Sequence, residues 1–68
     1  MNSFKKSLFE QFALIAKAMS NANRLEMLEF LAQCEYSVED LAAVTHLTIA
    51  NTSHHLQQLR NAGLVRTR

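Results

Sequence analysis

The adjacent histidines His54 and His55 are the residues in this sequence that most suggest chemistry, either as metal ligands or as acid and base. Neighbouring side chains on a helix point about 100° apart, so the two imidazoles cannot easily share one ion. A helical ligand pair needs i,i+4 spacing instead. Ser53 and His54 could be a nucleophile and its base, but their side chains diverge in the same way and no third group is visible. We therefore expect no metal site, no cofactor and no enzymatic activity.

The single cysteine, Cys34, could be a sensor of sulfur species or oxidants. A reactive thiol needs electropositive surroundings, whereas Glu35 is adjacent, and no second cysteine could resolve an oxidised form. We interpret Cys34 as a small apolar residue at a helix end. One free thiol suits a reducing compartment. The longest apolar run, residues 12–16, is too short to span a bilayer, and no secretory signal is visible, so the sequence predicts a cytoplasmic protein without a membrane partner.

Charge is distributed unevenly along a chain whose net charge is only +1. After Asp40 the charged residues are Arg60, Arg66 and Arg68, with no acid among them. A basic end on a near-neutral domain suggests a polyanionic partner. Three arginines could equally serve to keep the surface soluble, and charge alone does not separate these interpretations.

The elements that must position these residues are helical, because proline is absent, glycine occurs once and the helix period recurs. Residues 3–19 are predicted to form one amphipathic helix. Asn21 is a good N-cap for a second helix that ends near residues 33–35. The apolar stripe of the first helix contains Phe4, Leu8, Phe12, Ile15 and Met19, and that of the second contains Leu25, Leu28 and Leu31.

A short third helix is predicted over residues 38–44. Ser37 and Asp40 have the spacing of a capping box, in which the hydroxyl accepts from the Asp40 amide and the carboxylate reaches back. Thr45 and His46 then interrupt the helical pattern. The tight turn that follows is typical of two helices joined as a helix-turn-helix.

Thr48 is the next candidate N-cap and opens a helix over residues 49–61. Gly63 suits the left-handed position that ends a helix. Residues 64–68 have strand composition and could begin a wing hairpin. The sequence thus predicts one mainly α domain, residues 1–68, with a helix-turn-helix at 37–61 and only the first wing strand present.

The last helix has a polar face without carboxylates. At about 100° per residue, Thr52, Leu56 and Leu59 share the core side and His55 lies at its edge. A surface exposed only to solvent would usually mix Glu and Lys, whereas the phosphates that line a DNA groove would repel carboxylates. Asn and Gln can pair with adenine, and Ser and His can reach base edges or phosphates. Ala50, His54 and Gln57 face outward, with Ser53 on one flank and Asn51 and Gln58 on the other.

Two separated motifs resemble the ArsR family of winged helix-turn-helix repressors: "SVEDLAAVTHLTIANTSHHLQQLRNAGLVRTR" and, upstream, "NANRLEMLEFLA". The resemblance covers about residues 13–68. It implies a dimeric winged helix that binds an operator in double-stranded DNA and is released by an inducer. The matched positions that would contact DNA are Thr48, Ile49, Ala50, Asn51, Ser53 and His54, with Arg66 and Arg68 on the first wing strand.

Several positions depart from the family pattern. His46 stands where helix-turn-helix units often have glycine, and histidine tolerates positive φ better than most residues. Ile49 and Ala50 replace polar residues and could contact a thymine methyl group. Thr52 stands where a β-branched apolar residue is usual. Ser37 and Glu39 occupy the positions of the cysteine pair that senses metals in many members, so the inducer stays unidentified.

The first helix has more aromatic residues than a three-helix core needs, and the resemblance also places dimer contacts there. We expect a homodimer that reads the major groove with helix 49–61; the alternative is a helical dimerisation or protein-interaction module without DNA binding. The expected dimer contacts are Phe4, Leu8, Phe9 and Phe12. The helix face suggests three DNA contacts beyond those that the resemblance implies, namely Gln57, Gln58 and Arg60.

Overall fold

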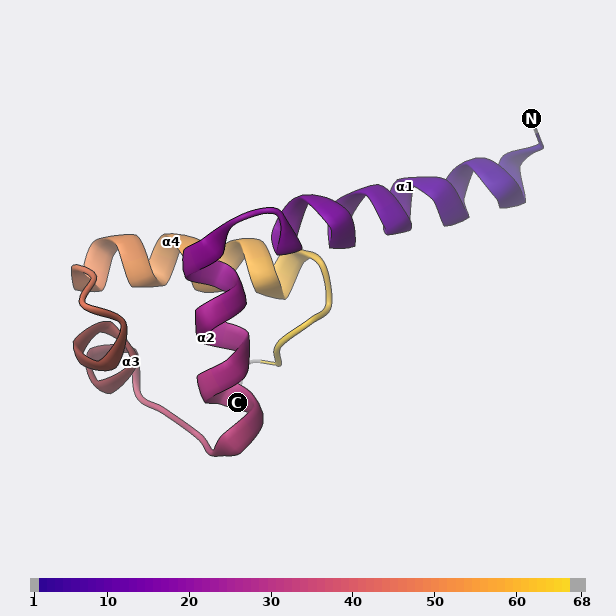
Figure 1. Cartoon of the computed structure of the whole chain (residues 1–68). Helices are drawn as coiled ribbons and strands as arrows, with labels where there is room; N and C mark the ends of the chain where they lie inside the picture. Colours follow the sequence, from indigo (N-terminus) through magenta and orange to yellow (C-terminus); the bar gives the residue numbers. More distant parts are fainter. Residues whose placement is uncertain (1, 67–68) are drawn as a thin grey trace.

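The computed structural model describes residues 2–66, which form four α-helices and no strand (Figure 1). The helices are α1 (Ser3–Met19), α2 (Ala22–Gln33), α3 (Val38–Thr45) and α4 (Ile49–Asn61). The mainly α class predicted from the sequence is confirmed. The predicted bounds of the first and last helices agree with those of α1 and α4, and α3 runs one residue further than predicted.

Each helix begins at a side-chain cap, which explains why the boundaries were readable in the sequence. A side-chain oxygen of the N-cap residue accepts the amide hydrogen of the residue three positions later, so one donor of the first turn is satisfied. Asn21, Ser37 and Thr48 were predicted as caps. Of the capping box, the structure shows the half in which Ser37 accepts. The four cap distances are Asn2 Oδ1 to Lys5 N 2.8 Å, Asn21 Oδ1 to Arg24 N 3.1 Å, Ser37 Oγ to Asp40 N 3.1 Å and Thr48 Oγ1 to Asn51 N 3.0 Å.

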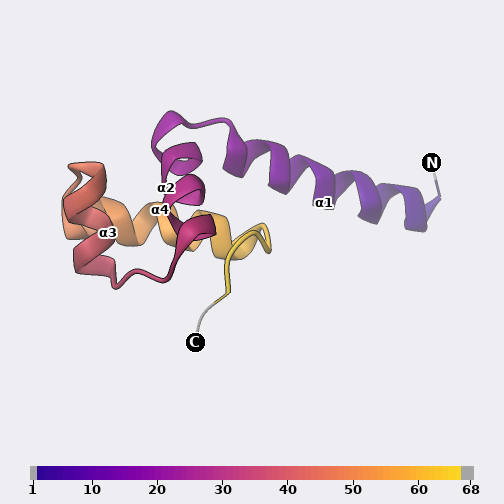
Figure 2. The same ribbon diagram turned by 60° about the horizontal axis from the view of Figure 1, so that its bottom comes forward.

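The core lies where α2, α3 and α4 meet. Met27, Leu41 and Leu59 are almost completely buried there, one from each helix. Helix α1 joins this core near its C-terminal end through Ala18. The N-terminal part of α1 extends away from the other helices, as two views of the chain show (Figures 1 and 2). Much of α1 therefore contacts no other helix of the described residues.

The turn between α3 and α4 depends on a left-handed residue. His46 has φ 59° and ψ 35°, and its amide donates to the carbonyls of Ala42 and Ala43. The Leu47 amide also donates to the Ala42 carbonyl, at 3.0 Å. The expectation that histidine would take the place of a turn glycine is confirmed. This turn joins α3 to α4 in a helix-turn-helix arrangement.

The chain leaves α4 through a Schellman motif. Gly63 has φ +75°, its amide donates to the Arg60 carbonyl, and the Leu64 amide donates to the Leu59 carbonyl. The predicted wing strand at 64–68 is not seen: residues 64–65 form a bend, residue 66 has no regular secondary structure, and residues 67–68 lie outside the described part. A strand needs a neighbouring strand for its backbone hydrogen bonds, and composition supplies none. Leu64 and Val65 pack on the helical core instead.

Candidate nucleic-acid interface

Helix α4 has one buried face that fixes it against the rest of the domain. Thr52 and Leu59 are completely buried and Leu56 is nearly so, as the helix period predicted. Thr52 is polar, but its hydroxyl donates to the Thr48 carbonyl at 2.8 Å, so no hydrogen-bonding group is left unsatisfied there. The remainder of α4 is consequently held in a defined orientation with its other faces available.

The opposite face of α4 is exposed and carries no carboxylate. Ala50, Asn51, Ser53, His54 and Gln57 are all exposed on it, so the structure brings these predicted site residues together on one helix. Thr48 and Ile49 are exposed at the N-terminal end of the same helix. The Thr48 hydroxyl accepts from the Asn51 amide and still has a hydrogen to donate.

Asn61 extends this polar face and was not among the predicted site residues. Its Oδ1 accepts from Gln57 Nε2 at 2.9 Å across one turn of the helix. The i,i+4 spacing places both side chains on one face, so the same pattern in the sequence could have indicated Asn61. The face therefore offers amide, hydroxyl and imidazole groups, which can both donate and accept hydrogen bonds as base edges require.

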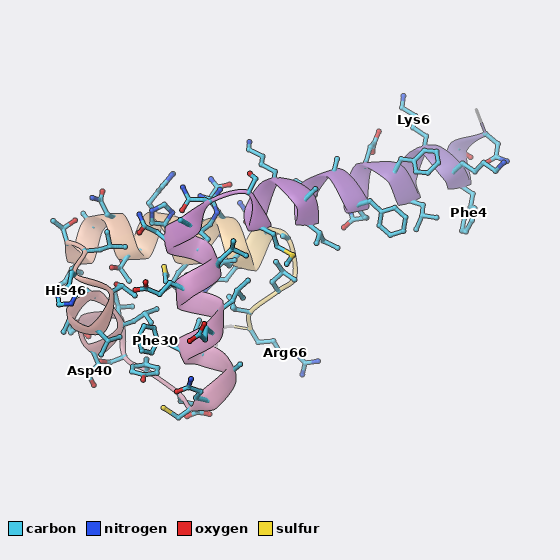
Figure 3. All side chains as sticks on the ribbon, in the orientation of Figure 1. Phe4, Lys6, Phe30, Asp40, His46 and Arg66 are labelled. Atoms are coloured by element: carbon cyan, nitrogen blue, oxygen red, sulfur yellow. The ribbon has the colours of Figure 1, made fainter. Side chains whose placement is uncertain are left out.

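The arginines lie apart from this polar face. Arg60 is half-buried, and its Nε atom is buried without a hydrogen-bond partner among the described residues. It lines a groove of about 700 Å³, with the end of α2 on one side and Leu64, Val65 and Arg66 on the other. Arg66 is exposed beyond the end of α4, on the other side of α2 from His46 (Figure 3). Gln58 is half-buried, and Arg68 lies outside the described residues.

His55 lies at the edge of the buried face and contacts Arg24 of α2. Arg24 Nη1 lies 3.1 Å from His55 Nδ1, while Arg24 Nε and Nη2 donate to the carbonyls of Ala18 and Lys17 at 2.7 and 3.1 Å. Desolvation, the charge of Arg24 and the neighbouring His54 all lower the pKa of His55 from its ordinary value of 6.5. His54 and His55 thus have separate surroundings, although their ring centroids are only 5.8 Å apart.

Cys34 lies at a helix end, as predicted: it is the C-cap of α2, and it is exposed there. A hydrogen bond with Cys34 is the main cause of the raised pKa of the Tyr36 hydroxyl, followed by desolvation and the charges of Cys34 and Asp40. Tyr36 also packs edge-to-face on Phe30, with ring centroids 5.8 Å apart. Within residues 2–66, no three His, Cys, Asp or Glu side chains are grouped so that they could hold a metal ion.

The predicted dimer residues lie on the part of α1 that extends from the domain. Phe4 is 75% exposed and Phe12 is 55% exposed, and Leu8 and Phe9 are exposed as well. Figure 3 shows Phe4 near the free end of this helix. No helix of the described residues is long and apolar enough to cross a membrane.

Comparison with known proteins gives three findings. The sequence model of the family described as "Bacterial regulatory protein, arsR family" matches residues 21–67. The chain is 41% identical over 64 residues to the HTH-type transcriptional regulator Rv0324 of Mycobacterium tuberculosis. The aligned residues make up 94% of this chain and 28% of that protein. It is 42% identical over 55 residues to the transcriptional activator HlyU of Vibrio cholerae. That alignment covers 81% of this chain and 51% of that protein. No solved structure gives a significant match.

The matched residues include α2, α3, α4 and the turn between the last two, which is the part that holds the exposed polar face. The chain spans about half the length of one of these relatives and less than a third of the other.

Proposed function

The chain belongs to the arsR family of bacterial regulatory proteins, and we propose that it binds duplex DNA as the DNA-binding part of a transcriptional regulator. Helix α4 enters the major groove, and α3 lies across the backbone beside it, as in other helix-turn-helix proteins. The proposal places this activity in the cytoplasm.

The observation that carries the proposal is the exposed face of α4, which is mostly polar and has no carboxylate. A major groove is about 12 Å wide and admits one helix, and its walls are rows of phosphates. A carboxylate on the inserted face would be repelled by those phosphates. The buried face of α4 leaves this polar face free, so DNA can approach without any rearrangement of the core.

Each exposed side chain then has a role that matches its chemistry. Asn51 and Gln57 can pair with adenine through their amide groups, and Ser53 and His54 can reach base edges or phosphates. Ile49 and Ala50 offer apolar contact to thymine methyl groups. Thr48 and Gln58 flank the groove. We assign Arg60, Arg66 and Arg68 to the phosphate backbone.

We further propose that the regulator is a homodimer and a repressor released by an inducer. A symmetric dimer through α1 would present two copies of α4 to successive major grooves, about 34 Å apart. Repression follows if the bound dimer blocks a promoter. The relative from Vibrio cholerae is named an activator. Transcription in vitro from a promoter beside a bound site therefore tests this direction, and increased transcript would contradict repression.

Salt-dependent binding to duplex DNA tests the proposed function. Binding is measured by fluorescence anisotropy with a labelled duplex while the salt concentration rises. If α4 and the arginines contact phosphates, the logarithm of the association constant falls linearly with the logarithm of salt concentration. Affinity that does not change with salt, or the absence of binding, would favour the alternative of a helical interaction module without DNA binding.

A further inference from the structure

Arg24 is a buried cation whose three acceptors are all neutral. Its exposed fraction is 9%, and its guanidinium donates to the carbonyls of Lys17 and Ala18 and to the imidazole of His55. The two carbonyls belong to the last turn of α1, where the helix dipole places partial negative charge, which stabilises a nearby cation. One side chain of α2 therefore connects the end of α1 to the middle of α4.

This contact requires a neutral His55. Arginine can only donate, so His55 Nδ1 must accept, and the single ring hydrogen must lie on Nε2. Protonation would place a hydrogen on Nδ1, remove the acceptor and bring a second cation against Arg24. The next residue, His54, faces the polar side of α4 and takes no part in this contact.

We propose that Arg24 is a positioning residue for DNA binding: it fastens α4 to the end of α1 through neutral His55, and protonation of His55 releases α4 and weakens binding to DNA. This inference rests on the proposed function, because it assumes that α4 contacts DNA. It adds a dependence on pH that the exposed face of α4 does not by itself predict.

Desolvation of His55, followed by the charges around it, sets the direction of this dependence by lowering the pKa of His55. Arg24 from α2 and His54 from α4 both disfavour the protonated form of His55. Helix α1 contributes only the Lys17 and Ala18 carbonyls to the Arg24 contact. Within the described residues, no carboxylate of α2 or α3 counteracts the effect of Arg24 and His54. Desolvation acts in the same direction, so the folded chain takes up this proton at lower pH than the unfolded chain does. The free energy of unfolding should therefore decrease as the pH falls below about 6.5.

His54 must be removed from the measurement, because its protonation adds positive charge beside DNA and would strengthen binding. The starting variant is therefore His54→Gln, and the matched control is His54→Gln with His55→Gln. Glutamine keeps a carbonyl oxygen that can accept from Arg24 but does not titrate. Both are titrated with a labelled duplex of mixed sequence at constant ionic strength, at pH about 7.5 and about 5.5.

We expect His54→Gln to bind more weakly at the lower pH, because only the fraction with neutral His55 is competent to bind. The double variant should show no such decrease, and His46, which both variants retain, does not affect the difference between them. An equal decrease in both variants, or no decrease in either, would overturn the inference and leave the proposed function intact. No DNA binding by the unchanged chain at either pH would refute the proposed function and this inference together.

Imidazole nitrogen NMR tests the contact without DNA. His55 in the unchanged chain should be a single tautomer with hydrogen on Nε2, whereas Arg24→Lys should shift it towards a mixture of tautomers. In the His54→Gln background, Arg24→Lys should also weaken DNA binding several-fold at pH about 7.5 and remove the pH difference. If Arg24 had a purely structural role, Arg24→Lys would lower the unfolding temperature but keep the difference in binding between the two pH values. A hydrogen on Nδ1 of His55 in the unchanged chain would refute the contact, even if Arg24→Lys fails to fold.

Discussion

Single positions on α4 differ in function because the helix places neighbours in different surroundings. His54 is exposed among polar side chains, whereas His55 is half-buried and accepts a hydrogen bond from Arg24. The same divergence of neighbouring side chains separates Thr52, which is completely buried, from exposed Ser53. A substitution on the exposed face should therefore mainly affect DNA recognition, and a substitution on the buried face should mainly affect stability.

Replacement of Asn51 or His54 by alanine tests recognition by the exposed face. Each variant should lose about 1–3 kcal/mol of binding to a selected high-affinity duplex and much less to a mixed-sequence duplex, because base contacts carry the difference. Binding is measured to both duplexes at one salt concentration. Gln11→Ala is the matched control, since Gln11 is an exposed polar residue of α1. Equal losses on the two duplexes would contradict base recognition by Asn51 and His54.

At the scale of the elements, two left-handed residues delimit α4. His46 ends α3 before α4 begins, and Gly63 directs the chain away after α4 ends. Histidine at positive φ is strained relative to glycine because of its Cβ atom. A Cβ atom added at Gly63 would meet no heavy atom within 4 Å, so a substitution there would be costly only through the backbone.

His46→Gly and Gly63→Ala should therefore change stability in opposite directions. Relief of strain at His46 should raise the free energy of unfolding by about 0.5–1 kcal/mol, after the larger entropy of glycine in the unfolded chain is included. Gly63→Ala should lower it by about 1 kcal/mol. Urea denaturation of both variants beside the unchanged chain measures these shifts. A stabilised Gly63→Ala variant would show that position 63 is not held in the left-handed conformation.

The helices themselves were predictable because their signals are local. Asn21, Ser37 and Thr48 are caps whose partners lie three residues away, and the buried face of α4 follows from the helix period alone. No comparable local signal indicates the role of Arg24, because its contacts with α1 and α4 exist only after the helices pack. The burial of Arg60 depends in the same way on the end of α2, which no helix period reveals. The predicted strand at Leu64 and Val65 is not seen, because strand composition alone does not supply a partner strand.

At the scale of the whole molecule, the chain is long and narrow, with extents of 44 × 21 × 19 Å. Most of the length comes from α1, whose N-terminal part extends beyond the helical core (Figure 2). Exposure of several phenylalanines on one helix is unfavourable in water. Burial of such aromatic side chains in an interface contributes substantially to association. A second copy of α1 is the partner that the proposed dimer supplies.

Phe12→Glu tests the dimer directly. The substitution places a charge on the exposed apolar side of α1, and in a symmetric interface it does so twice, so dimers should dissociate. Ser7→Glu is the control, because Ser7 is exposed and lies about 140° around the helix from Phe12. Sedimentation velocity at tens of micromolar should show a dimer for the unchanged chain and for Ser7→Glu, and a monomer for Phe12→Glu. A monomeric unchanged chain would refute the interface, and DNA binding that stays equally tight in monomeric Phe12→Glu would show that one copy of α4 suffices.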